Sequence, residues 1–286
     1  GYLSMTLSYD VNTGKAAPYS ALTIVSTAAW GLGYFGMPHI LLRFMAIEDE
    51  KKLKLSRRVA TIWVVISLFV AVFIGVIGYT MSKVGALEML TGSNSETIIV
   101  KISALLSQHG VIFALLAGVI LAGILASTMS TSDSQLLAAS SAVSSDILGA
   151  FRKDSSNKNG SMAAARITLL VISVVAAFIA RNPDSSVFAI VSFAWAGFGA
   201  AFGPVVLFSL FWKRTNKWGA LAGMVCGGSM VFIWKYLIRP LGSIWNIYEL
   251  LPAFLIACAA IVIVSLLTPK PSKEIEEEFD RVAQMK

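Results

Sequence analysis

A cluster of oxygen-bearing side chains lies in the second half of a long segment, residues 111–148, whose first half is apolar. Its members are Ser127, Thr128, Ser130, Thr131, Ser132, Asp133, Ser134 and Gln135. Hydroxyl and carbonyl oxygens are the ligands that hard cations such as Na⁺ accept. The midpoint of the segment falls beside Ser130, so in a membrane helix the cluster begins at mid-depth. The pattern therefore indicates a candidate cation site.

Two other interpretations apply to the same hydroxyls. A Ser or Thr inside a helix can donate to the carbonyl four residues earlier, and small polar residues also bring helices into close contact. Asp133 lies three residues after Ser130, on the same helical face, where it could attract a cation without ligating it. An acid in a span costs about 2.5 kcal/mol or more, which makes it a functional candidate. Alternatively, Asp133 solvates a helix end at the cytoplasmic interface.

A second unusual stretch is WGLGYFGMPH, residues 30–39. Three glycines and a proline lie close together in an apolar run, and Gly costs about 1 kcal/mol and Pro about 3 kcal/mol relative to Ala in a helix. The stretch predicts a helix interrupted at membrane depth, which is tolerated only where it is buried or lines a cavity. Trp30 and Tyr34, four residues apart, would wall a substrate site. The alternative is a Gly-kinked packing helix with interfacial aromatics.

The stretch FAWAGFGAAFGPVVLF, residues 193–208, repeats this pattern. It puts Gly197, Gly199, Gly203 and Pro204 in mid-membrane, and an internal Pro kinks a helix. We expect a helix that moves as a gate, with close helix packing as the alternative. His39 is a lone histidine and is interpreted as structural.

The elements that carry these residues are membrane helices. The 286 residues are 56% hydrophobic and 14% charged, against roughly 25% charged in soluble domains. Continuous apolar runs favour an all-α integral membrane protein over a barrel. Seven transmembrane helices are expected, at about 19–47, 59–83, 111–148, 162–180, 186–212, 218–238 and 248–268. A polar loop is expected at 151–160 and a turn at 182–184.

The remaining segments are polar. Residues 1–17 are interpreted as a loop, and 269–286 as an amphipathic cytoplasmic helix. A surface helix is expected near 95–107, begun by a capping box of Ser93 and Glu96. The chain begins at Gly1 without a signal peptide, so we expect a fragment whose N-terminal part is missing.

The basic residues set the expected orientation. Most of the 23 Lys and Arg residues fall after the first, third and fifth spans or in the tail. Positive loops stay cytoplasmic, so the first residue is expected outside and the C-terminus inside. The net charge of +7 is thus explained by topology and does not imply nucleic acid.

With both clusters in view, the chain resembles the C-terminal half of the sodium/solute symporter family. The resemblance rests on WGLGYFGMPHILLRFMA (30–46), STMSTSDSQLLAASSA (127–142) and FAWAGFGAAFGPVVLFSLFW (193–212), and extends to GALAGM (219–224). It implies a leucine-transporter-type fold of two inverted five-helix repeats. The implied divisions are an extracellular loop at 1–18, the second repeat at 19–212, two appended helices at 213–268 and a cytoplasmic tail at 269–286.

The resemblance also implies residue roles. Trp30, Tyr34 and Pro38 match positions around the family's substrate site, here for L-proline. Ser130 and Thr131 match its sodium-ligating hydroxyls. Ser127 matches a residue that ligates through its backbone carbonyl; the best-known member has Ala there, and a carbonyl ligand tolerates the exchange. Asp133 departs from the pattern of the best-known member, so its role is inferred from the residues alone.

The function implied by the resemblance is sodium-coupled symport of L-proline into the cell, across the inner (plasma) membrane. No cofactor is expected, and the coupling ion is Na⁺. The expected partners are Na⁺, L-proline, the lipid bilayer and the missing N-terminal repeat, without which the fragment is not expected to transport. Another solute, such as pantothenate or a sugar, and a symporter-like sensor domain of a signalling kinase are alternatives. A membrane hydrolase lacks support, because no nucleophile elbow or metal-ligand spacing appears.

Overall fold

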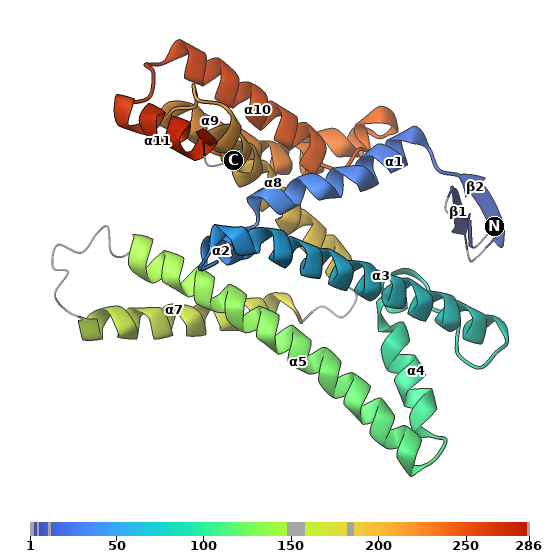
Figure 1. The fold of residues 1–286 in the computed structure, drawn as a ribbon. Helices are drawn as coiled ribbons and strands as arrows, with labels where there is room; N and C mark the ends of the chain where they lie inside the picture. Colours follow the sequence, from blue (N-terminus) through green and yellow to red (C-terminus); the bar gives the residue numbers. More distant parts are fainter. Residues whose placement is uncertain (1–2, 5, 11–12, 148–157, 182–185, 285–286) are drawn as a thin grey trace. The chain divides into compact units, whose positions relative to one another are not determined.

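The computed structural model describes residues 3–4, 6–10, 13–147, 158–181 and 186–284 (Figure 1). The chain divides into two compact units. Unit 1 comprises Gly1–Ala46 and Phe188–Lys286, and unit 2 comprises Ile47–Val187. The turn predicted at 182–184 lies outside the described residues, as does most of the loop predicted at 151–160.

The chain is helical, and six helices among the described residues are long and apolar enough to cross a membrane. They are Leu53–Lys83, Val111–Ser144, Met162–Ile179, Val187–Phe211, Lys217–Leu241 and Leu250–Leu267. Each coincides with a predicted span to within a few residues. The remaining predicted span, 19–47, is helical only in pieces and is therefore outside this set.

In unit 1, the segment at 19–47 consists of α1 (Ala21–Ala28), the 3₁₀ helix η1 (Ala29–Gly36) and α2 (Pro38–Met45). Between η1 and α2, Met37 is extended, with φ −83° and ψ 113°. A residue before proline is pushed out of the α region, and Pro is suited to the first position of a new helix. The interruption lies where the glycines and the proline predict it.

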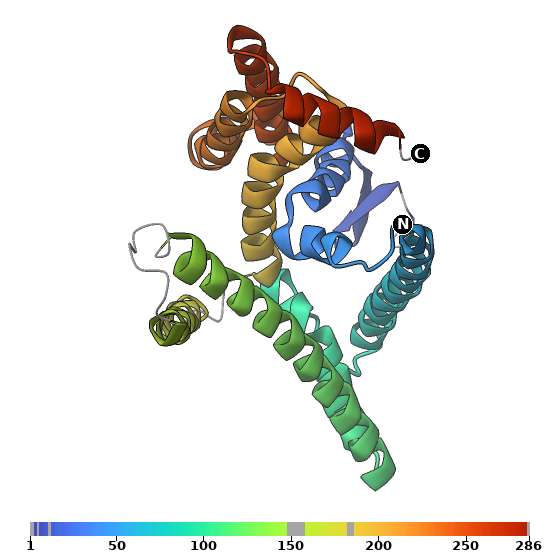
Figure 2. The same cartoon turned by 60° about the vertical axis from the view of Figure 1, so that its left-hand side comes forward.

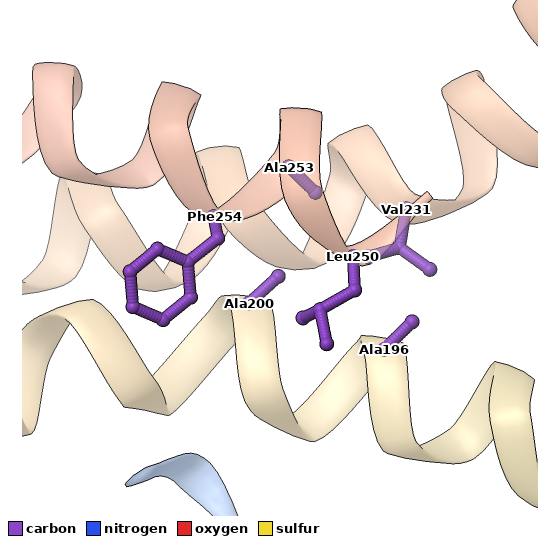
Figure 3. Close-up of a cluster of buried hydrophobic side chains, with 6 residues drawn as sticks. All are labelled: Ala196, Ala200, Val231, Leu250, Ala253 and Phe254. Atoms are coloured by element: carbon purple, nitrogen blue, oxygen red, sulfur yellow. The ribbon is translucent and has the colours of Figure 1, made fainter. Parts of the chain in front are cut away.

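The rest of unit 1 is built on the helices α8 (Val187–Phe211), α9 (Lys217–Ile233) and α10 (Leu250–Leu267). Unit 1 resumes at Phe188, the second residue of α8. Figure 3 shows the core, in which Ala196 and Ala200 of α8 face Leu250 and Phe254 of α10. Val231 of α9 and Ala253 complete the cluster. Small alanines at this contact let the helices approach closely.

The connection between α9 and α10 consists of the π-helical turn η5 (Trp234–Ile238) and the 3₁₀ turns η6 (Arg239–Leu241) and η7 (Ser243–Trp245). The chain ends in α11 (Lys273–Gln284), the tail helix that the sequence predicts. Lys213 contacts this helix, with its Nζ 2.6 Å from the Asp280 carboxylate.

The N-terminal residues differ from the predicted loop. The strands β1 (Leu7–Asp10) and β2 (Lys15–Pro18) pair antiparallel, with Leu7 opposite Pro18 and Asp10 opposite Lys15. Gly14, at φ +65°, donates its N–H to the Asp10 carbonyl at 2.9 Å and so closes the turn. The hairpin lacks the long apolar alternation that marks a strand in a sequence.

Unit 2 consists of η2 (Glu50–Lys52), α3 (Leu53–Lys83), η3 (Gly92–Thr97), α4 (Ile98–Ser107), α5 (Val111–Ser141), the π-helical turn η4 (Ala142–Ile147) and α7 (Lys158–Ile179). Figure 2 shows α5, in green, as one long helix whose first turns meet α4. The Ser140 hydroxyl donates to the Ala165 carbonyl at 2.7 Å and joins α5 to α7.

The predicted capping box at Ser93 and Glu96 is wrong. The α-helix begins five residues after Ser93, at Ile98, and no side chain caps it. The Glu96 carboxylate instead accepts from the Ser186 hydroxyl at 2.6 Å and from the Val187 N–H at 3.1 Å. Glu96 therefore binds a segment distant in sequence, which a local pattern cannot reveal.

Candidate functional site

Trp30 lies at the centre of an aromatic cluster within unit 1. Its ring is stacked with those of Phe188, Trp195 and Tyr248, at centroid distances of 5.4, 5.6 and 5.9 Å. The Trp195 indole N–H donates to the Trp30 carbonyl at 3.0 Å. Side chains from α8 and from the chain before α10 thus fix both the ring and the backbone of Trp30.

The glycines of η1 place this segment against α8. A Cβ at Gly33 would overlap the Trp195 indole, and one at Gly36 would overlap the Phe198 carbonyl and lie 2.8 Å from the Gly203 nitrogen. A Cβ at Gly31 would meet no atom within 4 Å. The close-packing interpretation therefore holds for two of the three glycines, and those two let the interrupted backbone reach α8.

The other two predicted substrate residues are more accessible than Trp30. Tyr34 is 52% exposed and meets Trp195 edge to face, at a centroid distance of 4.8 Å. Pro38 is exposed at the first turn of α2. The segment thus offers an exposed aromatic ring beside an interrupted backbone, which suits a small solute with an apolar body and a polar end.

The two predicted gate residues of α8 differ in their surroundings. A Cβ at Gly197 would meet nothing within 4 Å, whereas one at Gly199 would lie 2.7 Å from the Gly33 Cα. Pro204 is fully buried, and α8 continues on both sides of it. Close packing accounts for Gly199 but leaves Gly197 without a packing role in unit 1, and the gate stays a prediction.

The hydroxyl cluster lies on α5 in unit 2, and its side chains from Ser127 to Gln135 are exposed. Thr128 donates to the Ile124 carbonyl at 2.9 Å, and Thr131 to the Ser127 carbonyl at 3.1 Å. The alternative interpretation, in which a hydroxyl bonds to the carbonyl four residues earlier, therefore holds for Thr128 and Thr131.

The same bond places two predicted sodium ligands together. The Ser127 carbonyl oxygen and the Thr131 hydroxyl are 3.1 Å apart. Thr128 makes the same local bond without a predicted ligand role, so this distance does not separate a sodium ligand from the helix-bonding alternative. Ser130 is the neighbour of Thr131, and Asp133 is exposed two residues further on. The sodium ligands therefore stay a prediction.

The structure assembles each predicted set within its own unit. Trp30, Tyr34 and Pro38 belong to unit 1, and Ser130 and Thr131 to unit 2. The joining of the two sets into one site stays a prediction.

Sequence reasoning did not identify Tyr248 or Phe188 as neighbours of Trp30. Trp195 lies in the quoted 193–212 motif, but no role was assigned to it. Tyr248 directly precedes the last apolar span, a place where aromatic residues are common at membrane interfaces, so its type carried no distinctive signal.

Comparison with known proteins identifies the family. The model of the Sodium:solute symporter family matches residues 5–227. The chain belongs to the sodium:solute symporter family. The matched residues include the interrupted segment, the hydroxyl cluster and α8.

The curated relatives of this symporter-family chain include several proline transporters. It is 42% identical over 263 residues to the sodium/proline symporter of Haemophilus influenzae, covering 91% of this chain and 51% of that protein. It is 39% identical over 254 residues to the osmoregulated proline transporter of Bacillus subtilis, covering 89% and 50%. The chain thus spans about half the length of the relatives it matches. No solved structure matches it.

Proposed function

We propose that the full-length protein is a sodium-coupled symporter that carries L-proline into the cell across the plasma membrane. The single observation that carries this proposal is the similarity to a protein named as a sodium/proline symporter, at 42% identity over 263 residues. The interrupted segment and the hydroxyl cluster both lie within the family match and supply residue types suited to a small solute and a cation.

In this proposal, Trp30, Tyr34 and Pro38 form one wall of the proline site. The ring of proline has an apolar face, which suits the exposed ring of Tyr34. The interrupted backbone supports the same assignment, since transporters bind solutes near the midplane at discontinuous helices.

The sodium ligands are the Ser127 carbonyl and the hydroxyls of Ser130 and Thr131. Their position within the residues that match the family supports the assignment. Asp133 adds negative charge without ligating the ion, and Gly197 and Pro204 let α8 move as a gate.

The proposed architecture is the leucine-transporter-type fold. Seven spans, counting the interrupted one, form the second inverted repeat and two appended helices. A first repeat of the same protein supplies the remaining sodium ligands and the rest of the proline site. The excess of Lys and Arg on one side supports an orientation with the first residue outside and the C-terminus in the cytoplasm.

Transport then requires no covalent chemistry and no cofactor. Sodium favours the outward-open state, and that state binds proline more tightly, so the inward sodium gradient drives proline uptake. A ligand shifts such an equilibrium only through its different affinities for the two states.

The test is uptake of radiolabelled L-proline by cells that produce the full-length protein, with Na⁺ and with Na⁺ replaced by K⁺. We expect uptake only with Na⁺, and a loss of at least tenfold in the variant with Ser130→Ala and Thr131→Ala. Excess unlabelled pantothenate or glucose should not compete. Uptake that is indifferent to Na⁺ and to both substitutions would refute the proposal.

A further inference from the structure

Tyr248, which lies just before α10, contacts the interrupted segment with both its ring and its backbone. Its ring is stacked on that of Trp30 at 5.9 Å, and its backbone N–H donates to the Ser26 hydroxyl of α1 at 3.1 Å. Its hydroxyl donates to the Ser192 carbonyl of α8 at 2.7 Å. One residue therefore joins α1, η1 and α8.

The chain on either side of Tyr248 is itself held in place. Glu249, which is 1% exposed, accepts from the Arg239 guanidinium at 2.8 Å. Arg239 also donates to the Asn246 side-chain oxygen at 3.0 Å, and the Trp234 indole donates to the Ile247 carbonyl at 3.3 Å. Side chains from η5 and η6 thus fix the residues before and after Tyr248.

The contacts of Tyr248 suit a residue that holds others in position. A tyrosine hydroxyl is protonated at neutral pH, so it remains the donor to the Ser192 carbonyl. The Trp195 ring stacks on Trp30 as well, and its edge-to-face partner is Tyr34. A shift of Trp30 therefore reaches the exposed ring of Tyr34 through Trp195.

From this geometry we infer that Tyr248 is a positioning residue for the proline site: it holds Trp30 against α8 and thereby sets the place of Tyr34. The inference rests on the proposed function, because it takes Trp30 and Tyr34 as part of that site. The inference gives the α9–α10 connection a part in solute affinity, although this connection lies outside the first five predicted spans.

The first experiment measures the kinetics of sodium-dependent proline uptake by the full-length protein. Tyr248→Leu removes the stacked ring and the hydroxyl, and we expect it to raise the proline KM about tenfold with Vmax per transporter within twofold. Tyr248→Phe keeps the ring, so its KM should rise about threefold at most. The matched control is Trp245→Leu, which removes a ring of the same connection that is paired with Trp234. Its KM should stay within twofold.

A double-mutant cycle separates positioning from general destabilisation. If Tyr248 acts through Trp30, Tyr248→Leu should raise KM less than twofold further when Trp30→Leu is already present, because contacting residues are not additive. If Tyr248→Leu and Trp30→Leu raise KM independently, so that their two factors multiply in the double variant, the inference is overturned. An unchanged KM in Tyr248→Leu, or an equal rise in Trp245→Leu, would also overturn it. Absence of sodium-dependent uptake in the unsubstituted protein would instead refute the proposed function.

A second measurement does not depend on the solute. In the purified full-length protein, Tyr248→Leu should lower the melting temperature, and that fall should be at least halved when Trp30→Leu is already present, because residues in contact are not additive. The fall caused by Trp245→Leu should be the same with and without Trp30→Leu. Equal falls from Tyr248→Leu in the two backgrounds would show that Tyr248 does not act through Trp30 and would overturn the inference whatever the protein carries.

Discussion

Units 1 and 2 hold their candidate residues by different means. In unit 1, Trp30 is fixed by rings and a hydrogen bond from residues more than 150 positions away along the chain. In unit 2, Thr131 bonds a carbonyl one turn earlier on its own helix. The geometry of the interrupted segment is thus a product of long-range packing, whereas that of the hydroxyl cluster requires only that α5 be helical.

The largest expected effect tests the packing in unit 1. Gly36→Ala places a methyl group against α8 backbone, which cannot move aside as a side chain can. Overpacking costs typically about 1–3 kcal/mol, and we expect the upper end here. The melting temperature of the purified full-length protein should fall by several degrees and proline uptake should fall at least tenfold. Gly31→Ala, where the methyl group has open space, should change neither the melting temperature nor proline uptake. Equal effects of Gly31→Ala and Gly36→Ala would contradict the close packing of Gly36 against α8.

The next effect compares an ion pair in each unit. Glu249 is buried against Arg239 in unit 1, and Glu88 is exposed against Lys101 in unit 2, at 2.6 Å. Because Arg239 is partly exposed, we expect Glu249→Gln to lower stability by about 1–3 kcal/mol. Glu88→Gln should cost less than about 1 kcal/mol. Thermal unfolding of both variants measures the two losses of stability. A larger loss for Glu88→Gln than for Glu249→Gln would contradict the prediction that the buried ion pair matters more.

Within unit 2, two threonines make the same local bond but differ in predicted role. Thr128 and Thr131 both donate to the carbonyl four residues earlier. Thr131→Ala should raise the sodium concentration that half-activates uptake about tenfold, equivalent to about 1.4 kcal/mol of sodium binding. Thr128→Ala should leave it within twofold. Titrations of uptake against sodium concentration measure both variants. Equal rises in the half-activating sodium concentration would mean that both hydroxyls only bond their own helix and that Thr131 is not a sodium ligand.

The smallest effect concerns the tail helix of unit 1. The hydrogen bond to Asp280, together with the negative charges of Asp280 and Glu276, raises the pKa of Lys213 above its ordinary value of 10.5. A raised lysine pKa means that the contact is present below pH 10.5 and is lost as pH rises through the higher value. The rate of trypsin cleavage at Arg281, relative to its rate on an unstructured peptide at the same pH, should therefore be constant from pH 7 to 9 and slightly faster in Lys213→Gln. A steep pH dependence within that range would contradict this assignment.

The features that the sequence predicted correctly depend on local chemistry. Apolar length predicts the six continuous spans, and the restriction that Pro38 places on Met37 predicts the interruption. The tail helix follows from its own amphipathic pattern.

Features that depend on contacts between distant residues were not predictable in the same way. Gly31 and Gly33 are alike in sequence, yet only Gly33 meets another side chain, because Trp195 lies there. Glu96 matched a local cap but binds Ser186 and Val187. Tyr248 became a candidate only when its three partners were seen together.

The most direct test of the account is equilibrium binding of radiolabelled L-proline to the purified full-length protein, with and without Na⁺. If the interrupted segment and the hydroxyl cluster act as one coupled site, Na⁺ should tighten proline binding at least tenfold. In the variant with Ser130→Ala and Thr131→Ala, the same Na⁺ should tighten it less than twofold. Proline affinity that is equal with and without Na⁺ in the unsubstituted protein would contradict the account.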